Sequence, residues 1–305
     1  MAGKRRSRIQ RTRTGRRLAL SARDIEIFKL LSRYRYLRST YIHAFVGGAS
    51  ETRFKERLGD LFHEGYLDRP AQQWEFADAR CRPVVHELGA GALRVLRDHG
   101  EGAGQNTFLS GTAHRQFRHS LMICEALASF ELGAHASGSG PRFIAWPEIL
   151  ARAPESVWTS SIPFQLPNSS GGYLVPDGVF GLEYRVGDTR SYRFFALEID
   201  RGTMPVERSD PKQTSYLGKL AAYRAIIAQQ VHKTTWGIPN LLVLTMTTNS
   251  SRLADMLVKL GNDGIHPAFL FGVSTEQVLA RPMPQLLTRP WQRAGLPSLS
   301  IAEAR

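Results

Sequence analysis

Apolar residues in the first part of the chain recur at the spacing of amphipathic helices, and three such stripes follow one another. The first begins at Ser21, where Asp24 completes a capping box. The second is short and covers residues 39–48, and the third begins near Ser50 and ends at Gly65. Three short helices with glycines in the turn before the third predict a helix-turn-helix.

The segment after the third helix has the pattern of a small sheet followed by a closing helix. Residues 66–69 predict a strand, residues 74–76 its return and residues 83–88 a further strand, before a helix over residues 89–96. Together with the three helices, this order predicts a winged-helix domain over residues 20–97. Such a domain places its second motif helix against the base edges of DNA.

A polar, glycine-rich stretch over residues 98–112 predicts a linker. The pattern then changes to helices that alternate with strand-like apolar runs, which predicts an α/β domain with a mixed sheet over residues 113–280. Four prolines interrupt the chain after residue 281, so we expect an irregular tail over residues 281–305. The predicted fold class is α/β, with an N-terminal winged helix-turn-helix.

Two β-rich runs flank Gly187-Asp188, which predicts a hairpin with a two-residue turn. In that register Asp177 lies opposite Glu198, and Asp200 projects on the same face as Glu198. Three carboxylates at one strand end repel one another unless a cation lies between them. Because hard cations prefer carboxylate oxygens, the pattern predicts a site for Mg²⁺ or Mn²⁺.

Glu125 is the one charged residue in the apolar centre of a helix predicted over residues 114–133. A buried carboxylate needs a compensating partner. Two alternatives stay open for this residue. Glu125 is a further ligand of the predicted metal, or it lies at the edge of the helix and pairs with an arginine.

The overall composition is that of a soluble globular protein, with 42% hydrophobic and 22% charged residues in a chain of 305. The apolar runs are too short to cross a bilayer, so we expect no membrane partner. Cys81 and Cys124 lie far apart, which argues against a disulfide framework or a zinc site. This cysteine usage predicts a cytoplasmic protein.

The net charge of +13 is concentrated at the N-terminus, where eight basic and no acidic residues occupy the first 17 positions. This run predicts a disordered basic tail over residues 1–19 that contacts phosphates, so double-stranded DNA is the predicted partner. Basic residues also occupy the outward face of the third helix. The predicted DNA-binding residues are Arg5, Arg6, Arg8, Arg53, Lys55 and Arg57.

Several motifs behind the predicted winged helix resemble the replication-relaxation proteins of bacterial plasmids and mobile elements. They are H-x5-E from His119 to Glu125, V-P-D-G-x-F from Val175 to Phe180, F-F-x-L-E-x-D-R-G-T from Phe194 to Thr203 and K-L-x-x-Y from Lys219 to Tyr223. The resemblance implies an accessory role in plasmid replication or mobilisation, with a relaxase or a replication initiator as a partner.

The second domain also resembles the PD-(D/E)xK, or restriction-endonuclease-like, nuclease fold. By this resemblance Asp177 and Glu198 are the motif acids, Glu125 matches an acid on a helix, and Asp200 stands where a lysine is expected. Lys219, in the following helix, is the candidate substitute for that lysine. Three functions stay open: a DNA-binding accessory protein, a Mg²⁺-dependent endonuclease or nickase with catalytic residues Asp177, Glu198, Asp200 and Lys219, and a winged-helix transcriptional regulator.

Overall fold

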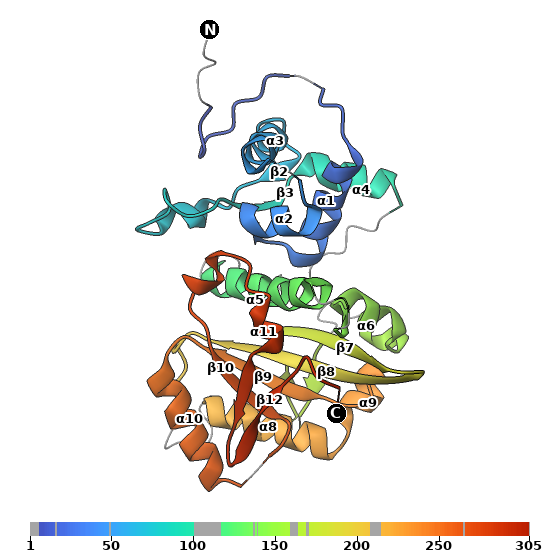
Figure 1. The fold of residues 1–305 in the computed structure, drawn as a ribbon, viewed down its shortest axis with the longest axis vertical. Coiled ribbons are helices and arrows are strands. Elements are labelled where there is room, and N and C mark those ends of the chain that lie inside the picture. Colours follow the sequence, from blue (N-terminus) through green and yellow to red (C-terminus); the bar gives the residue numbers. More distant parts are fainter. Residues whose placement is uncertain are drawn as a thin grey trace. The chain divides into compact units, whose positions relative to one another are not determined.

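The computed structural model describes residues 6–15, 17–48, 50–100, 117–136, 138, 140–158, 164–168, 171–207, 215–264 and 266–304. The chain forms two compact units (Figure 1). The first comprises Met1–Ala128 with Ala280–Pro282, and the second comprises Ser129–Leu279 with Met283–Arg305. Apart from residues 98–100, the predicted linker lies outside the described residues.

The first unit contains helices and a small antiparallel sheet with strand order β1-β3-β2. Its helices are α1 (Ala22–Tyr34), α2 (Ser39–Val46), α3 (Glu51–His63), the 3-10 helix η1 (Ala71–Glu75), α4 (Ala90–Asp98) and the start of α5 (Phe117–Ala136). Its strands are β1 (Leu37–Arg38), β2 (Leu67–Asp68) and β3 (Val85–Leu88). Helices α1 to α4 and strands β2 and β3 lie in segments that the sequence predicts, whereas β1 and η1 were not predicted.

The helix caps and the buried apolar stripe predicted for the first unit are present in the structure. The side chain of Ser21 accepts a hydrogen bond from the backbone N–H of Asp24. The side chain of Asp24 in turn accepts one from the backbone N–H of Ser21, which completes the capping box. Ser50 caps α3 by accepting a hydrogen bond from the N–H of Arg53. The predicted stripe on α3 is buried: Phe54, Leu58, Leu61 and Phe62 are at most 5% exposed.

The predicted returning strand at residues 74–76 is wrong, because this segment lies at the end of η1. The side chain of Gln73 takes the place of a strand at this point. Its amide nitrogen donates to the carbonyl of Val85 at 3.0 Å, and its amide oxygen accepts from the N–H of Val85 at 2.8 Å. A single side chain thus satisfies the backbone groups that a strand would have paired.

The prediction of a disordered N-terminal tail is wrong for the described residues 6–15, which are held by specific hydrogen bonds. Arg11 donates from Nε to the carbonyl of Phe62 and from Nη2 to the carbonyl of Leu67, both at 2.8 Å. The N–H of Thr12 bonds to Nδ1 of His63 at 3.0 Å. The last carbonyls of α3 have no partner within the helix, so a nearby guanidinium group satisfies one of them.

The second unit is built on a seven-stranded mixed sheet of order β12-β11-β10-β9-β8-β7-β4, in which β8, β9 and β10 run parallel. The strands are β4 (Arg142–Ile144), β7 (Gly178–Val186), β8 (Thr189–Asp200), β9 (Leu242–Thr247), β10 (Phe269–Val273), β11 (Pro290–Arg293) and β12 (Leu296–Ser300). A separate pair is formed by β5 (Leu166–Pro167) and β6 (Tyr173–Leu174). The α/β class and the mixed sheet are as predicted.

Helices cover both faces of this sheet (Figure 1). They are the end of α5, α6 (Trp146–Arg152), α7 (Glu155–Trp158), α8 (Tyr216–Ala228), α9 (Val231–Trp236), α10 (Ser250–Asn262), the 3-10 helix η3 (Val278–Ala280) and α11 (Gln285–Thr288). Phe130 of α5 stacks on Phe180 of β7, with ring centroids 4.8 Å apart. Tyr223 of α8 reaches Glu198 from the other face. The apolar core therefore lies between α5 and the sheet, and the polar site lies beneath α8.

The β7–β8 hairpin has the predicted register. Val186 pairs with Thr189 across the turn, and the ladder continues without a shift to Gly178 opposite Leu197. Gly187 has a positive φ of 57°, which suits a glycine in a two-residue turn. The next position along the ladder brings Asp177 and Glu198 to the same strand end.

The predicted irregular tail over residues 281–305 is wrong, because α11, β11 and β12 extend the sheet. Pro290 is the first residue of β11, and Pro297 lies in the edge strand β12. Proline has no N–H, but at these two positions the sheet requires no hydrogen bond from one. Trp291 and Ile301 are fully buried and anchor the segment. Burial of these side chains outweighs the proline signal.

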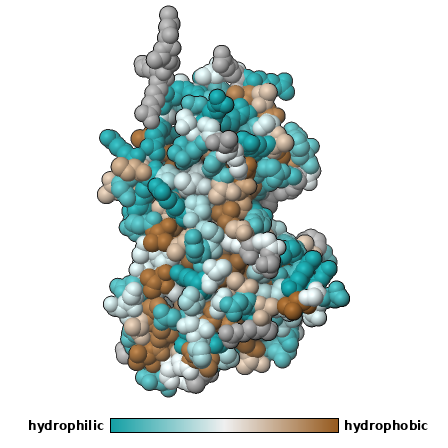
Figure 2. Space-filling view, viewed as in Figure 1, coloured by the Kyte–Doolittle hydropathy of each residue, from teal (hydrophilic) through white to brown (hydrophobic). Residues whose placement is uncertain are grey.

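Within the described ranges, no helix has both the length and the apolar character that a bilayer crossing requires. Figure 2 shows apolar and hydrophilic residues interspersed on the visible surface. Large apolar side chains that are exposed occur singly, as at Ile9, Val186 and Val258. Isolated residues of this kind are ordinary at a protein surface.

Candidate functional site

Three predicted residues of the second unit meet beneath α8: Asp177, Glu198 and Lys219. Asp177 precedes β7, and Glu198 lies near the end of β8. Ser215 caps α8 by accepting a hydrogen bond from the N–H of Gly218, which sets the start of the helix. Lys219 and Tyr223 are four residues apart on α8 and therefore project from the same face.

The contacts at this cluster are direct. The ammonium group of Lys219 donates to Oε2 of Glu198, and the hydroxyl of Tyr223 donates to Oε1 at 2.5 Å. Oδ2 of Asp177 accepts a hydrogen bond from the N–H of Ile199 at 2.8 Å. Both oxygens of Glu198 are thus engaged, and Asp177 is fixed against the adjoining strand. The structure brings Lys219 to Glu198, as the sequence predicts for the substitute lysine.

Burial controls the ionisation of these groups. Glu198 is 3% exposed, and burial raises its pKa to about 7; Lys219 opposes this rise, while Asp177 adds to it. Burial also acts against the charge of Lys219, but the carboxylates of Glu198 and Asp177 outweigh it and hold the pKa of Lys219 above its ordinary value. The site thus holds a proton near neutral pH within a lysine–carboxylate cluster.

Asp200, the third carboxylate of the predicted site, has partners on α10 and β9. The guanidinium group of Arg252 binds both oxygens of Asp200, with Nη2 to Oδ1 at 2.9 Å. Thr247 donates to Oδ2 at 3.1 Å. Asp200 does lie on the predicted face, but α10 places an arginine there, so the charge is compensated without a metal.

Glu125 has an arginine partner, as in the second alternative, but the pair is buried and does not lie at the edge of the helix. Oε1 of Glu125 lies 2.7 Å from Nε of Arg38, and neither side chain is more than 1% exposed. Both residues belong to the first unit, whereas Asp177 and Glu198 belong to the second. The carboxylate of Glu125 thus has a buried counter-charge.

In the part of the chain that the structure describes, no three His, Cys, Asp or Glu side chains form a group that could hold a metal ion. Of the four predicted carboxylates, Asp177 and Glu198 lie together. Mg²⁺ in nucleases and kinases is often held by one or two carboxylates together with substrate phosphates. The pair fits that chemistry only with a phosphate-bearing substrate present.

The predicted DNA-binding residues of α3 have different surroundings. Arg57 binds Asp24, with Nε to Oδ1 at 3.0 Å and Nη2 to Oδ2 at 2.7 Å, and it also donates to the carbonyl of Ala19. Because Asp24 is 1% exposed, Arg57 compensates a buried charge. Arg53 and Lys55 are exposed, and Lys55 pairs with Glu51 at 2.6 Å. Arg53 and Lys55 are therefore the exposed cations of this helix, whereas Arg57 is engaged with Asp24.

The N-terminal arginines lie against the first unit. Arg6 pairs with Asp60 of α3, and Arg8 donates to the carbonyls of Arg80 and Arg82 at 2.8 and 3.2 Å. Arg5 lies outside the described residues. The basic residues between β2 and β3 were not predicted, and their only signal in the sequence is the run R-C-R at residues 80–82.

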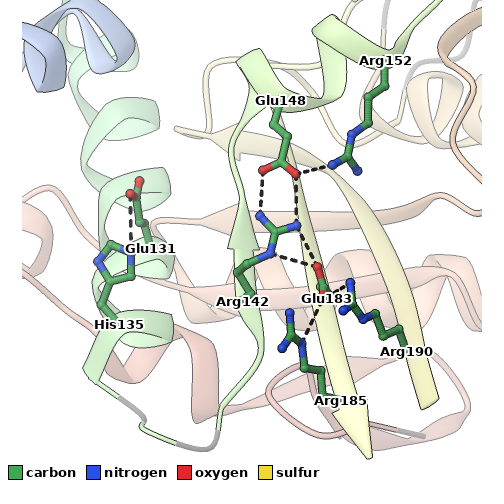
Figure 3. A network of polar contacts seen from close by, with 8 residues as sticks. All are labelled: Glu131, His135, Arg142, Glu148, Arg152, Glu183, Arg185 and Arg190. Carbon is green, nitrogen blue, oxygen red and sulfur yellow. Dashed lines mark hydrogen bonds and ion pairs between the residues drawn. The ribbon is translucent and has the colours of Figure 1, made fainter. Parts of the chain in front are cut away.

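A charged network in the second unit was also not predicted (Figure 3). Arg142 of β4 binds Glu183 of β7 and Glu148 of α6, with nitrogen–oxygen distances of 2.8–3.0 Å. Arg185 donates to Glu183 at 3.0 Å. The hydrogen bond from Arg142 lowers the pKa of Glu183, which is 3% exposed. The network attaches the edge strand β4 to its neighbours and places charges on that edge, which disfavours pairing with another chain.

A comparison with protein families identifies a match. The sequence model of a protein family described as Replication-relaxation matches residues 28–241, more than half of the chain. The matched range contains α3, the β7–β8 hairpin and α8, and so includes both the outward face of α3 and the Asp177–Glu198–Lys219 cluster. No curated protein and no solved structure matches the chain.

Proposed function

Because this chain belongs to the replication-relaxation family, which is associated with plasmid replication and mobilisation, we propose that it is a cytoplasmic accessory protein that binds double-stranded DNA. The first unit acts as a winged helix and contacts the duplex through α3. The protein partner proposed is a relaxase or a replication initiator that works on the same DNA.

The outward face of α3 is the observation that carries this proposal. The helix buries its apolar stripe completely, and its opposite face exposes Thr52, Arg53, Lys55 and Glu56. Ser50 caps the N-terminus, so the first turn is ordered where a reading helix meets base edges. Arg53 is in that first turn and extends into solvent, which suits a guanidinium group that contacts a base or a phosphate.

Replacing Arg53 by alanine is expected to weaken binding to the preferred DNA site by about 1–3 kcal/mol. The thermal unfolding midpoint should stay near that of the wild type, because the side chain is exposed. Fluorescence anisotropy on duplexes from a plasmid-origin library measures the affinity. Unchanged affinity on the preferred duplex would show that α3 is not the reading helix.

Two matched variants separate binding from folding. Arg57→Ala leaves Asp24 buried without its guanidinium partner, so it should lower the unfolding midpoint more than Arg53→Ala. Arg94→Ala removes an exposed charge from α4 and should change neither property. If the preferred site is confined to a promoter operator, the alternative of a transcriptional regulator replaces the accessory role.

A metal-dependent DNA endonuclease is a second candidate function, and the contact of Lys219 with Glu198 next to Asp177 favours it. Asp177 and Glu198 would hold Mg²⁺ or Mn²⁺ together with phosphate oxygens, and the ion would stabilise charge on the phosphate. Lys219 keeps the Glu198 side chain oriented and supplies the cation that the resemblance to nucleases requires.

This second candidate predicts nicking of supercoiled plasmid DNA that requires Mg²⁺ or Mn²⁺. Glu198→Gln and Lys219→Met should each abolish the nicking, whereas Arg94→Ala should not. Gel separation of supercoiled and nicked plasmid measures the reaction. Protein that binds the plasmid but leaves it supercoiled with either ion would rule out the endonuclease and leave the DNA-binding proposal intact.

A further inference from the structure

The first unit contains a cavity of about 790 Å³ beside α3. Its walls come from the N-terminal segment, the start of α2, the outward face of α3, the β2–β3 connection and residues 281–282. Carboxylates in the lining are Glu51 and Glu56 alone among the described residues. The cationic lining residues are Arg6, Arg8, Lys55, Arg69, Arg80, Arg82 and Arg281.

Hydrogen bonds hold this wall in place before any ligand arrives. Arg8 spans the carbonyls of Arg80 and Arg82, and Nη1 of Arg69 donates to the carbonyl of Arg8 at 2.7 Å. The guanidinium group of Arg69 also lies over the ring of Phe62, 4.0 Å from its centroid. The arginines that the sequence assigns to a free tail are thus attached to those of the β2–β3 connection. Their positive charges are preorganised around the cavity before a ligand binds.

The positive charge of the cavity is only partly neutralised. Arg6 pairs with Asp60, Lys55 with Glu51, and Arg82 with Asp78. Arg8, Arg69, Arg80 and Arg281 have no carboxylate within ion-pair distance in the described ranges. Burial, together with Arg8, Arg11 and Arg6, lowers the pKa of Arg69 to about 10, so the cations repel one another. An anion bound here would relieve that repulsion.

We infer that this cavity binds the phosphodiester backbone of the DNA duplex that α3 contacts, an inference that rests on the proposed function. Guanidinium groups bind phosphate oxygens in a bidentate fashion, and arginines from three separate segments suit a ligand with repeated charges. The cavity adjoins the outward face of α3 through Thr52 and Lys55. The proposed ligands of the cavity are therefore the phosphates next to the bases that α3 contacts.

The test replaces two arginines that line the cavity but whose side chains make none of the hydrogen bonds that hold its wall together. Arg80 and Arg281 are exposed, so Arg80→Gln with Arg281→Gln should leave folding unchanged. The matched control is Arg94→Gln with Arg97→Gln, which removes the same charge from the exposed side of α4. Affinity for a fluorescent duplex is measured by anisotropy over a series of salt concentrations.

Each lost phosphate contact should reduce the slope of log K against log salt by about 0.9, so the cavity variant should lose about 1.8 and the control close to none. The ranking of preferred sites should not change. A cavity variant that behaves like the control, while Arg53→Ala still weakens binding, would overturn this inference and leave the proposed function standing. A wild-type protein that binds no duplex would overturn both.

Discussion

Glu125→Ala is expected to lower the free energy of unfolding of the first unit by about 3–5 kcal/mol. The substitution leaves the guanidinium group of Arg38 buried at 1% exposure without its carboxylate, 2.7 Å away in the wild type. Arg38 keeps only weaker compensation, such as its hydrogen bond to the carbonyl of Pro83 at 3.2 Å. Urea unfolding followed by tryptophan fluorescence and circular dichroism measures the change.

Two variants make this result specific. Glu26→Ala removes an exposed carboxylate from α1 and should cost well under 1 kcal/mol. Arg38→Met with Glu125→Leu removes both charges and should recover most of the loss, because apolar residues of similar volume can replace a buried ion pair. If Glu125→Ala unfolds at the same urea concentration as Glu26→Ala, the buried pair does not stabilise the unit.

The second large effect concerns pH and Glu198. Its pKa is about 7 in the folded protein, above the ordinary value of 4.5, so the folded protein binds this proton more tightly than the unfolded chain does. The stabilisation is complete below pH 4.5 and is lost as pH rises through about 7. A tenfold difference in proton affinity corresponds to about 1.4 kcal/mol, so about 3 kcal/mol disappears across this window.

Glu198→Gln isolates this effect, because glutamine stays neutral at every pH. The stability of the variant relative to the wild type should therefore rise by about 3 kcal/mol from below pH 4.5 to above pH 7. Lys219 has a raised pKa, so its contribution is present below its ordinary value of 10.5 and lies outside the window. A stability difference between variant and wild type that is constant with pH would contradict the assigned ionisation of Glu198.

Features set by neighbouring residues could be predicted from the sequence. The capping box of Ser21 and Asp24, the buried stripe of α3 and the register of the β7–β8 hairpin all follow from spacings of a few residues. The position of Asp177 opposite Glu198 follows from that register, since the pairing of one residue in a β-ladder determines the pairing of its neighbours. The sequence therefore predicts the part of the candidate site that depends on this one hairpin.

Partners that come from distant segments could not be predicted. Lys219 was named as a candidate for Glu198, but Arg252 and Arg38 were not linked to Asp200 and Glu125, because no spacing rule connects a helix to a strand about fifty or more residues away. The C-terminal strands were missed for a similar reason. Their prolines resemble a loop locally, and only the burial of Trp291 shows that the segment belongs to the sheet.

The sequence by itself determined the helices of the first unit, the β7–β8 hairpin and the excess of positive charge, because caps, periodicity and turns act over a few residues. The tertiary structure alone decided which charges are available. It engaged Arg57 and Asp200 with buried or half-buried partners, and it gathered Arg8, Arg69 and Arg80 around one cavity. A buried charge requires a partner in space, and the fold, rather than the spacing along the chain, determines which residue that partner is.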